Sequence, residues 1–226
     1  RLDWLLVLII GAMSLAYLIV ALTPSLESDS LMGHLVIPRE YARQHALLVV
    51  DHAYGTIFPQ NAQLISTFGF LIRGQIQAQL LVSWLPGVLS LAVVYALGRT
   101  FVPLRSRLIA IIVWYGTYSM SYLATSAKLD VAWSAFDLLG LLAFSNWYFA
   151  NRDDRHWRWL ILAGIFFGPA GGVKSVSLFT VIVLSLAVAV RLWRDNQRRP
   201  SRWMAAYLAL GVPSATLAGV WVVRTF

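Results

Sequence analysis

The 226-residue chain contains no cysteine and few charged residues, since Asp, Glu, Lys and Arg together make up 12% of it. A soluble domain carries about 25% charged residues, so this composition excludes an ordinary water-soluble globule. The lack of cysteine excludes thiol chemistry and a disulfide scaffold. Hydrophobic residues make up 59% of the chain, and the mean hydropathy is +0.69. These values are typical of a helical membrane protein, because long uncharged apolar runs are stable in lipid.

Apolar segments along the chain predict about seven membrane-spanning helices in a single transmembrane domain, residues 1–226. A helix needs about 20 residues to cross the hydrocarbon core, and most of the segments have that length. They are Trp4–Leu22, Leu80–Gly98, Leu108–Ala124, Leu129–Phe149, Trp159–Pro169, Val173–Leu192 and Trp203–Val223. The predicted fold class is therefore an all-α, polytopic transmembrane bundle. Gly164 and Gly168 in the short fifth segment have the spacing of a helix-packing motif.

Positive charge predicts the orientation of the chain. The net charge is +8, and the arginines cluster in the short loops 99–107, 151–158 and 191–202. Cytoplasmic loops of membrane proteins carry an excess of Lys and Arg, so we place these loops inside and the long connection 23–79 outside. In a soluble chain this charge would point to nucleic acid. Between apolar runs it indicates topology and contact with lipid headgroups, and we expect no nucleic-acid partner.

The first outer loop, residues 23–79, is far longer than the usual connection of about 4–6 residues. Pro38 fits the first turn of a helix that runs to about residue 50, and apolar residues recur there at helical spacing, at Leu31, Leu35, Ala42, Ala46 and Val49. A second helix is predicted over Asn61–Ile72, with an apolar stripe formed by Leu64, Ile65, Phe68 and Leu71. We expect both helices to be amphipathic and to lie on the outer membrane surface.

Charged residues at membrane depth are costly and are therefore candidates for function. They are Asp29, Lys128, Asp130, Asp137 and Lys174. The two lysines are the only ones in the chain, and Lys128 shares a predicted helix start with Asp130. Lys174 ends the glycine-rich stretch 168–174, where a backbone can approach a ligand closely and an ammonium can hold a phosphate.

Each of these residues also has a structural interpretation, which the sequence leaves open. Lys128 and Asp130 are a local ion pair in one interpretation, and Asp130 is only a favourable charge at a helix N-terminus in another. Lys174 extends to the lipid headgroups in its structural interpretation. Asp137 is favoured as a hydrogen-bond acceptor between helices.

The stretch from Glu27 to His34 places two carboxylates just after the first predicted span. Asp29 either caps the surface helix or acts as a general base toward a hydroxyl at the membrane boundary. His34 would then orient this base or bind a headgroup. Metal ligation by Asp29 with His34, His45 or His52 matches no standard spacing, so no metal ligands are assigned and a divalent metal stays open.

These motifs and their order resemble the GT-C superfamily, the polytopic glycosyltransferases that use lipid-phosphate-linked sugars. The closest resemblance is to its bacterial glycosyltransferase family 39 branch, related to protein O-mannosyltransferases and to the aminoarabinose transferase of lipid A. In chain order, the matching elements are Thr23-Pro24 with Glu27–Leu35, Phe58–Asn61, Tyr95–Arg99, Lys128–Ala132, Gly171–Lys174 and Trp221–Arg224. Gly33 stands where the family commonly has Tyr. Members are usually about twice as long, so the chain resembles their amino-terminal half.

The resemblance implies an inverting enzyme that transfers a sugar from a polyprenyl phosphate to an acceptor hydroxyl on the extracytoplasmic face. It implies that Asp29 is the catalytic base, and that Lys174 and Arg224 lie near the donor phosphate. The secondary candidates for the site are Glu27, His34, Lys128 and Asp130.

The same resemblance implies an integral membrane protein of the bacterial inner membrane, with its long first loop outside. Its expected partners are membrane lipids, the polyprenyl-phosphate sugar and other membrane subunits, and no cofactor is assigned beyond that donor. The alternative, favoured by Gly33, is a non-catalytic subunit that keeps the fold as a scaffold of a larger complex. A transporter is a third interpretation, supported by Asp137 alone, since no inverted repeat is evident.

Overall fold

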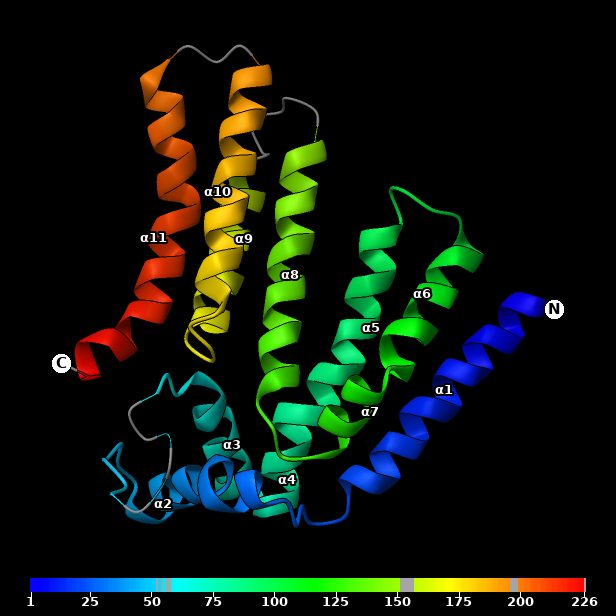
Figure 1. Ribbon diagram of the computed structural model, residues 1–226, viewed down its shortest axis with the longest axis vertical. Helices are drawn as coiled ribbons and strands as arrows, with labels where there is room; N and C mark the ends of the chain where they lie inside the picture. Colours follow the sequence, from blue (N-terminus) through cyan, green and yellow to red (C-terminus); the bar gives the residue numbers. More distant parts are fainter. Residues whose placement is uncertain (52, 54, 56–57, 151–156, 196–198, 226) are drawn as a thin grey trace. The chain divides into compact units, whose positions relative to one another are not determined.

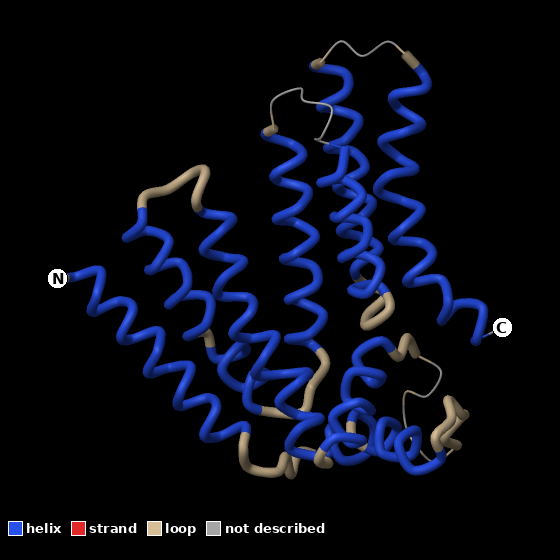
Figure 2. The backbone as a smooth tube through the Cα atoms, turned by 180° about the vertical axis from the view of Figure 1, so that it is seen from behind, coloured by secondary structure: helices blue, strands red, loops and turns tan. Residues whose placement is uncertain are grey.

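The computed structural model describes the chain apart from residues 52, 54, 56–57, 151–156, 196–198 and 226, and apart from the side chains of residues 222–226. Helices account for 81% of the chain, and the described residues contain no strand (Figure 2). The predicted all-α class is therefore confirmed. The chain divides into two compact units, Arg1–Ala135 and Phe136–Phe226.

The first unit is built from α-helices, which Figure 1 labels, and from two short π-helical turns. They are α1 (Leu2–Ala21), η1 (Ser30–His34), α2 (Val36–Gln44), α3 (Asn61–Ile72), α4 (Gln75–Gln79), η2 (Leu80–Trp84), α5 (Leu85–Gly98), α6 (Leu104–Gly116), α7 (Tyr118–Thr125) and the first residues of α8 (Asp130–Phe149). The second unit holds the rest of α8, α9 (Trp157–Gly171), α10 (Ser177–Arg194) and α11 (Pro200–Thr225). The elements η1 and η2 are π-helical turns, in which backbone hydrogen bonds span five residues instead of four.

Four described helices are long and apolar enough to cross a membrane: α1, the continuous stretch Gln75–Gly98, α10 and Pro200–Trp221 of α11. The helices α6 and α7 meet at a bend of 65°, and they bring the number of such candidates to five if the pair is counted as one span. The predicted span Leu108–Ala124 is therefore a bent pair of helices and not one continuous helix. Thr117 is extended there, and its side chain accepts a hydrogen bond from the backbone N–H of Met120, which starts a new helix.

The predicted spans Leu129–Phe149 and Trp159–Pro169 are both helical, as α8 and α9, but neither is among these candidates. Helix α9 has 15 residues, fewer than the roughly 20 that a span needs. Helix α8 has 20 residues but carries Asp130 and Asp137. The structure thus confirms several helices that are long and apolar enough to span, and the total of seven stays a prediction.

The two helices expected in the first outer loop are present, and one differs from its prediction. Helix α3 has the predicted bounds, Asn61–Ile72. Helix α2 ends at Gln44, about six residues early, because His45 adopts a left-handed conformation with φ 49°. Ala46 and Val49 therefore lie beyond the helix and are exposed. The residues that α2 buries are Ile37, Pro38 and Tyr41.

Helix α3 buries its small and polar face, formed by Ala62, Gln63, Ser66 and Gly69, and not the apolar stripe, which was predicted to face the membrane. From that stripe, Phe68 is 60% and Leu71 is 56% exposed. Small residues bring helices close together, and outward apolar side chains suit a lipid environment. A Cβ on Gly69 would lie 2.4 Å from the Cα of Ala78, so glycine sets the close approach of α3 to α4.

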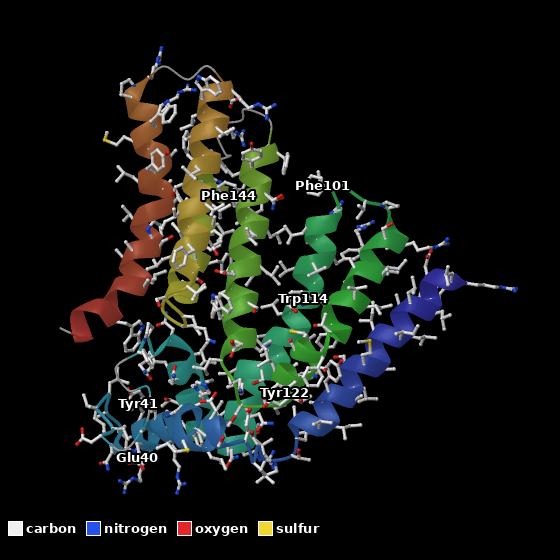
Figure 3. The ribbon with its side chains drawn as sticks, viewed as in Figure 1. Glu40, Tyr41, Phe101, Trp114, Tyr122 and Phe144 are labelled. Atoms are coloured by element: carbon white, nitrogen blue, oxygen red, sulfur yellow. The ribbon has the colours of Figure 1, made fainter. Side chains whose placement is uncertain are left out.

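Hydrogen bonds and aromatic contacts join α1 to the other helices of the first unit. The Tyr17 hydroxyl donates to the carbonyl of Tyr115 at 3.1 Å, and the Trp84 indole donates to the carbonyl of Ser14 at 3.0 Å. Trp114, labelled in Figure 3, donates to Ser90 at 2.9 Å. The contacts of Tyr17 and Ser14 fix the end of α1 from which the first loop begins, and that of Trp114 joins α6 to α5.

In the second unit, small residues let α9 pack closely against α11. A Cβ on Gly164 would lie 2.5 Å from the carbonyl oxygen of Leu210, and one on Gly168 would lie 2.9 Å from that of Pro213. The interpretation of this glycine pair as a packing motif is confirmed. Asp137 accepts hydrogen bonds from Ser177 of α10 at 2.8 Å and from Thr180 at 3.3 Å, as its structural interpretation predicts.

Candidate functional site

A fully buried glutamine, Gln79, ties the start of the first loop to the segment before α8. Its amide nitrogen shares its two hydrogens among three carbonyls, those of Ala21 at 3.1 Å, Thr23 at 3.2 Å and Thr125 at 3.0 Å. Its amide oxygen accepts from the backbone N–H of Ser25 at 3.2 Å. Because these bonds bridge residues about a hundred positions apart, Gln79 determines which parts of the two segments face each other.

A buried serine on the next turn of the same helix completes this connection. The Ser83 hydroxyl donates to the carbonyl of Ser126 and lies 3.3 Å from that of Lys128. Ser83 is fully buried, so its bonds form away from competing water. Gln79 and Ser83 thus hold residues 23–25 and 125–128 together, and the charged residues that follow each segment meet as a result.

The charged side chains that meet there form the candidate site, which consists of Glu27, Asp29, His34, Tyr122 and Lys128. The Lys128 ammonium lies 2.9 Å from Oε1 of Glu27 and 3.5 Å from Oδ2 of Asp29. Nε2 of His34 lies 3.6 Å from the same Asp29 oxygen. The Tyr122 hydroxyl donates to Glu27, and the Tyr122 ring lies 5.4 Å from the Lys128 ammonium. All five side chains belong to the first unit.

The two carboxylates of the site differ in exposure and in their partners. Glu27 is 22% exposed and is contacted by Lys128, by Tyr122 and by the hydroxyl of Ser30, which donates at 3.3 Å. The Asp29 side chain is 49% exposed. A carboxylate must be accessible in order to accept a proton from a bound molecule. Asp29 therefore presents the accessible carboxylate, while Glu27 anchors Lys128.

The π-helical turn η1 explains how Asp29 meets His34. Two residues five apart lie about 140° from each other around the axis of a regular α-helix. In η1 the turn is wider, as the 2.8 Å bond from the N–H of Leu35 to the carbonyl of Ser30 indicates. The wider turn brings position i+5 nearly above position i. Asp29, which precedes η1, and His34, which ends it, then share one face.

The charge of Lys128 is stabilised by this arrangement. Its hydrogen bond to Glu27 raises the pKa of the Lys128 ammonium above its ordinary value of 10.5, and the nearby Asp29 charge acts in the same direction. Partial desolvation opposes these effects. Lys128 is therefore a cation throughout the physiological range, beside the accessible carboxylate of Asp29.

The remaining predicted site residues are Asp130, Lys174 and Arg224. Asp130 is the first residue of α8, in the first unit. Lys174 belongs to the second unit and lies in the turn between α9 and α10, where its backbone N–H donates to the carbonyl of Ala170 at 2.9 Å. Arg224 is in the last turn of α11, and its side chain is outside the described part of the structure. The structure thus brings Glu27, Asp29, His34 and Lys128 together.

Among the described residues, no group of three His, Asp or Glu side chains could hold a metal ion. His52, one of the histidines considered for such a site, lies outside the described residues. The site also includes Tyr122, and it is supported by Gln79 and Ser83. None of these three residues was predicted from the sequence. The available signal for Gln79 and Ser83 was their position in or just before the apolar segment Leu80–Gly98, because a buried polar group requires a partner.

Residues 59–218 match the model of a protein family described as dolichyl-phosphate-mannose-protein mannosyltransferase. The chain belongs to this family. The expected resemblance to GT-C membrane glycosyltransferases is thereby confirmed, and the chain is an integral membrane protein of that class. A search of curated proteins finds no match.

Two solved structures share the fold. One is a chain of the S. cerevisiae protein O-mannosyltransferase Pmt1-Pmt2 complex bound to the sugar donor, with a TM-score of 0.73 and 17% identity. The other is ArnT from Cupriavidus metallidurans bound to undecaprenyl phosphate, with a TM-score of 0.76 and 19% identity. The matches cover 98% and 97% of this chain, but 34% of the first relative and 41% of the second. The chain thus spans well under half the length of either protein.

Proposed function

We propose that this protein transfers a sugar from a polyprenyl phosphate to an acceptor hydroxyl on the extracytoplasmic face of a bacterial inner membrane. The observation that carries the proposal is the half-exposed Asp29 carboxylate, which lies between Lys128 and His34 while Glu27 is occupied by other partners. Family membership and the donor or carrier lipid in the two related structures support this class of substrate.

One accessible carboxylate meets the chemical need of such a reaction. A glycosidase uses two carboxyl groups because its leaving alcohol must be protonated. A phosphate is already stable as an anion when it leaves, so only the attacking hydroxyl needs a base. In the proposed step, Asp29 accepts the hydroxyl proton, the acceptor oxygen bonds to the anomeric carbon, and the bond to the phosphate breaks with inversion.

The other residues receive supporting roles in this proposal. Lys128 and His34 hold the Asp29 carboxylate in place, and Glu27 with Tyr122 holds Lys128. Lys174 and Arg224 are proposed to stabilise the departing phosphate, as the family resemblance implies, because cations near developing negative charge lower the barrier. The polyprenyl chain would remain in the lipid, which suits the apolar outer surfaces of the helices.

The test compares Asp29→Asn with Asp3→Asn in the purified full-length protein. Asp3 pairs with Arg105 at 3.1 Å at the start of α1 and provides a matched loss of a carboxylate. Polyprenyl-phosphate sugars radiolabelled in the sugar are supplied, with cell membranes as the source of acceptor. We expect Asp29→Asn to lower transfer at least about a hundredfold while donor binding is kept, and Asp3→Asn to leave transfer unchanged.

Two other outcomes would count against the proposal. Transfer that survives Asp29→Asn would remove Asp29 from the mechanism. A wild-type protein that binds no donor and co-purifies stoichiometrically with other membrane subunits would instead be a scaffold.

A further inference from the structure

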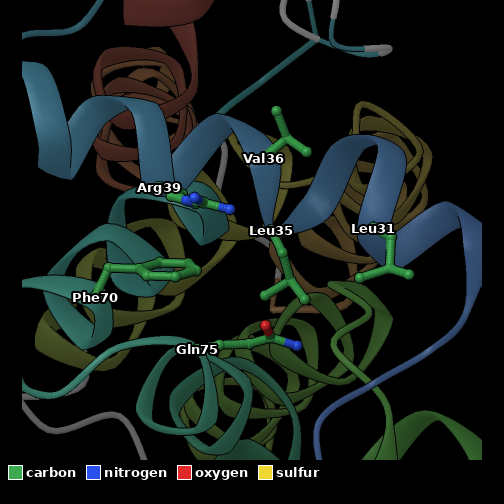
Figure 4. Close-up of a pocket in the computed structure, with 6 residues that line it drawn as sticks. All are labelled: Leu31, Leu35, Val36, Arg39, Phe70 and Gln75. Carbon is green, nitrogen blue, oxygen red and sulfur yellow. The ribbon is translucent and has the colours of Figure 1, made fainter.

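A pocket of about 200 Å³ lies in the first unit, apart from the charged site. Its walls come from the η1–α2 segment on one side and from α3 and α4 on the other (Figure 4). The lining residues are Leu31, Leu35, Val36, Arg39, Phe70 and Gln75. None of the five side chains of the candidate site lines this pocket, so its occupant need not be the substrate of the transfer reaction.

Arg39 brings an available positive charge to the pocket. Its guanidinium forms no ion pair or hydrogen bond with the described side chains. Arg43, one turn further along α2, is bound to Glu40 at 2.9 Å. A guanidinium offers several donors in one plane and binds phosphate or carboxylate oxygens in pairs. Figure 4 shows the Arg39 side chain beside Phe70, with Gln75 beyond Leu35.

The rest of the pocket is apolar, and its surroundings are too. Leu35 is buried, and Phe70 forms the wall on α3. Outside the pocket, α3 exposes Phe68, Leu71 and Ile72 by more than half, and Met32 of η1 is 65% exposed. An inorganic anion would gain nothing from these surfaces. A ligand with an anionic head and an apolar chain would use both the charge and the apolar surface.

We propose that this pocket binds the anionic headgroup of a membrane phospholipid. Arg39 and the Gln75 amide contact the phosphate, and Leu31, Leu35 and Phe70 contact the first carbons of the chains. Pockets that enclose a drug-sized ligand measure about 300–1,000 Å³. At about 200 Å³, this pocket takes the head and the beginning of a chain, and the rest of the lipid lies along the exposed apolar face of α3.

The experiment measures lipid binding to the purified full-length protein in detergent by native mass spectrometry. Phosphatidic acid, phosphatidylcholine with the same acyl chains, and inorganic phosphate are the three probes. The variants are Arg39→Gln, the matched control Arg43→Gln, and Leu31→Trp, which fills the pocket without changing charge. Arg39 is exposed and Leu31 is 43% exposed, so both substitutions are compatible with folding.

The expected results follow from the contacts. Phosphatidic acid binds more tightly than phosphatidylcholine. Arg39→Gln weakens the binding of phosphatidic acid about tenfold, which corresponds to the loss of one charge-assisted pair of hydrogen bonds. Leu31→Trp weakens the binding of phosphatidic acid to a similar extent, and Arg43→Gln changes this binding less than about twofold. Equal loss in Arg39→Gln and Arg43→Gln would overturn the proposal in favour of general surface charge. Inorganic phosphate that binds as well as phosphatidic acid would overturn it in favour of a free anion.

Discussion

The two units of the chain use different interactions to hold their helices together. In the first unit, buried polar side chains bind loop backbones, as Gln79 does with four hydrogen bonds to residues at the ends of α1 and α7. In the second unit, glycines bring α9 against the backbone of α11. Its core is formed by large apolar side chains such as Trp147 and Phe167.

This difference indicates where precise positioning is needed. Packing of small against large residues brings helices close, but it supplies no directional contact to a loop. Hydrogen bonds from a buried amide depend on distance and angle, so they fix the position of the loop backbone that they bind. The polar connections lie where Glu27, Asp29 and Lys128 must meet, which is the arrangement expected if the first unit carries the chemistry.

The largest expected effect tests the polar connection directly. Gln79→Leu would leave three buried or part-buried carbonyls and the N–H of Ser25 without this partner, and each such loss costs about 1–3 kcal/mol. We expect the free energy of unfolding to fall by about 3 kcal/mol, and sugar transfer to fall as Asp29 and Lys128 separate. Unfolding in mixed micelles measures the first, and radiolabel transfer measures the second.

Gln77→Leu is the matched control for this substitution. Gln77 lies on the same helix, half-buried, and it forms no hydrogen bond through its side chain to the described residues. We expect Gln77→Leu to change the free energy of unfolding by less than about 1 kcal/mol. Equal effects of the two substitutions would mean that the Gln79 hydrogen bonds do not determine the position of the loops.

The next effect tests packing in the second unit. Gly164→Ala would place a Cβ 2.5 Å from the carbonyl oxygen of Leu210, so α9 and α11 must move apart. We expect a loss of about 2 kcal/mol, measured by the same unfolding assay. Gly211→Ala on α11 is the control, because its Cβ would meet nothing within 4 Å. Alanine there should be neutral or slightly stabilising, and a loss equal to that of Gly164→Ala would contradict the packing argument.

The smallest effect concerns pH. Because the pKa of Lys128 is raised in the folded protein, its ion pairs contribute stability that is fully present below about pH 10.5 and is lost as the pH rises through the raised pKa. The melting temperature should therefore fall by a few degrees more for the wild type than for Lys128→Met across that range. Lys128→Arg stays charged there and should keep the stability. Parallel melting curves for all three proteins would show that these ion pairs contribute nothing.

Local patterns in the sequence predicted much of the helical structure. The all-α class, the bounds of α3 and the glycine packing motif follow from composition, periodicity and spacing within one segment. The end of α2 was missed because the left-handed conformation of His45 has no signal in the apolar periodicity. The bend at Thr117 was missed because the hydropathy of the segment continues through it.

The site itself was predicted only in part, since its contacts join distant segments. Local spacing paired Lys128 with Asp130, whereas the structure joins Lys128 to Glu27 and Asp29, about a hundred residues away. Which residues meet at this distance depends on Gln79 and Ser83, whose partners are backbone carbonyls. Every residue has a backbone carbonyl, so the sequence does not indicate which carbonyls these two side chains bind.

The wide turn η1 makes the surroundings of Asp29 depend on the number of residues as much as on their identity. A π-helical turn contains one residue more than the α-helical turn that would replace it. Shortening the chain by one residue between Ser30 and His34 would restore ordinary helical winding and carry the imidazole to another side of the axis. Evolution could therefore give this acid a different neighbour by a single codon deletion, with no charged residue substituted.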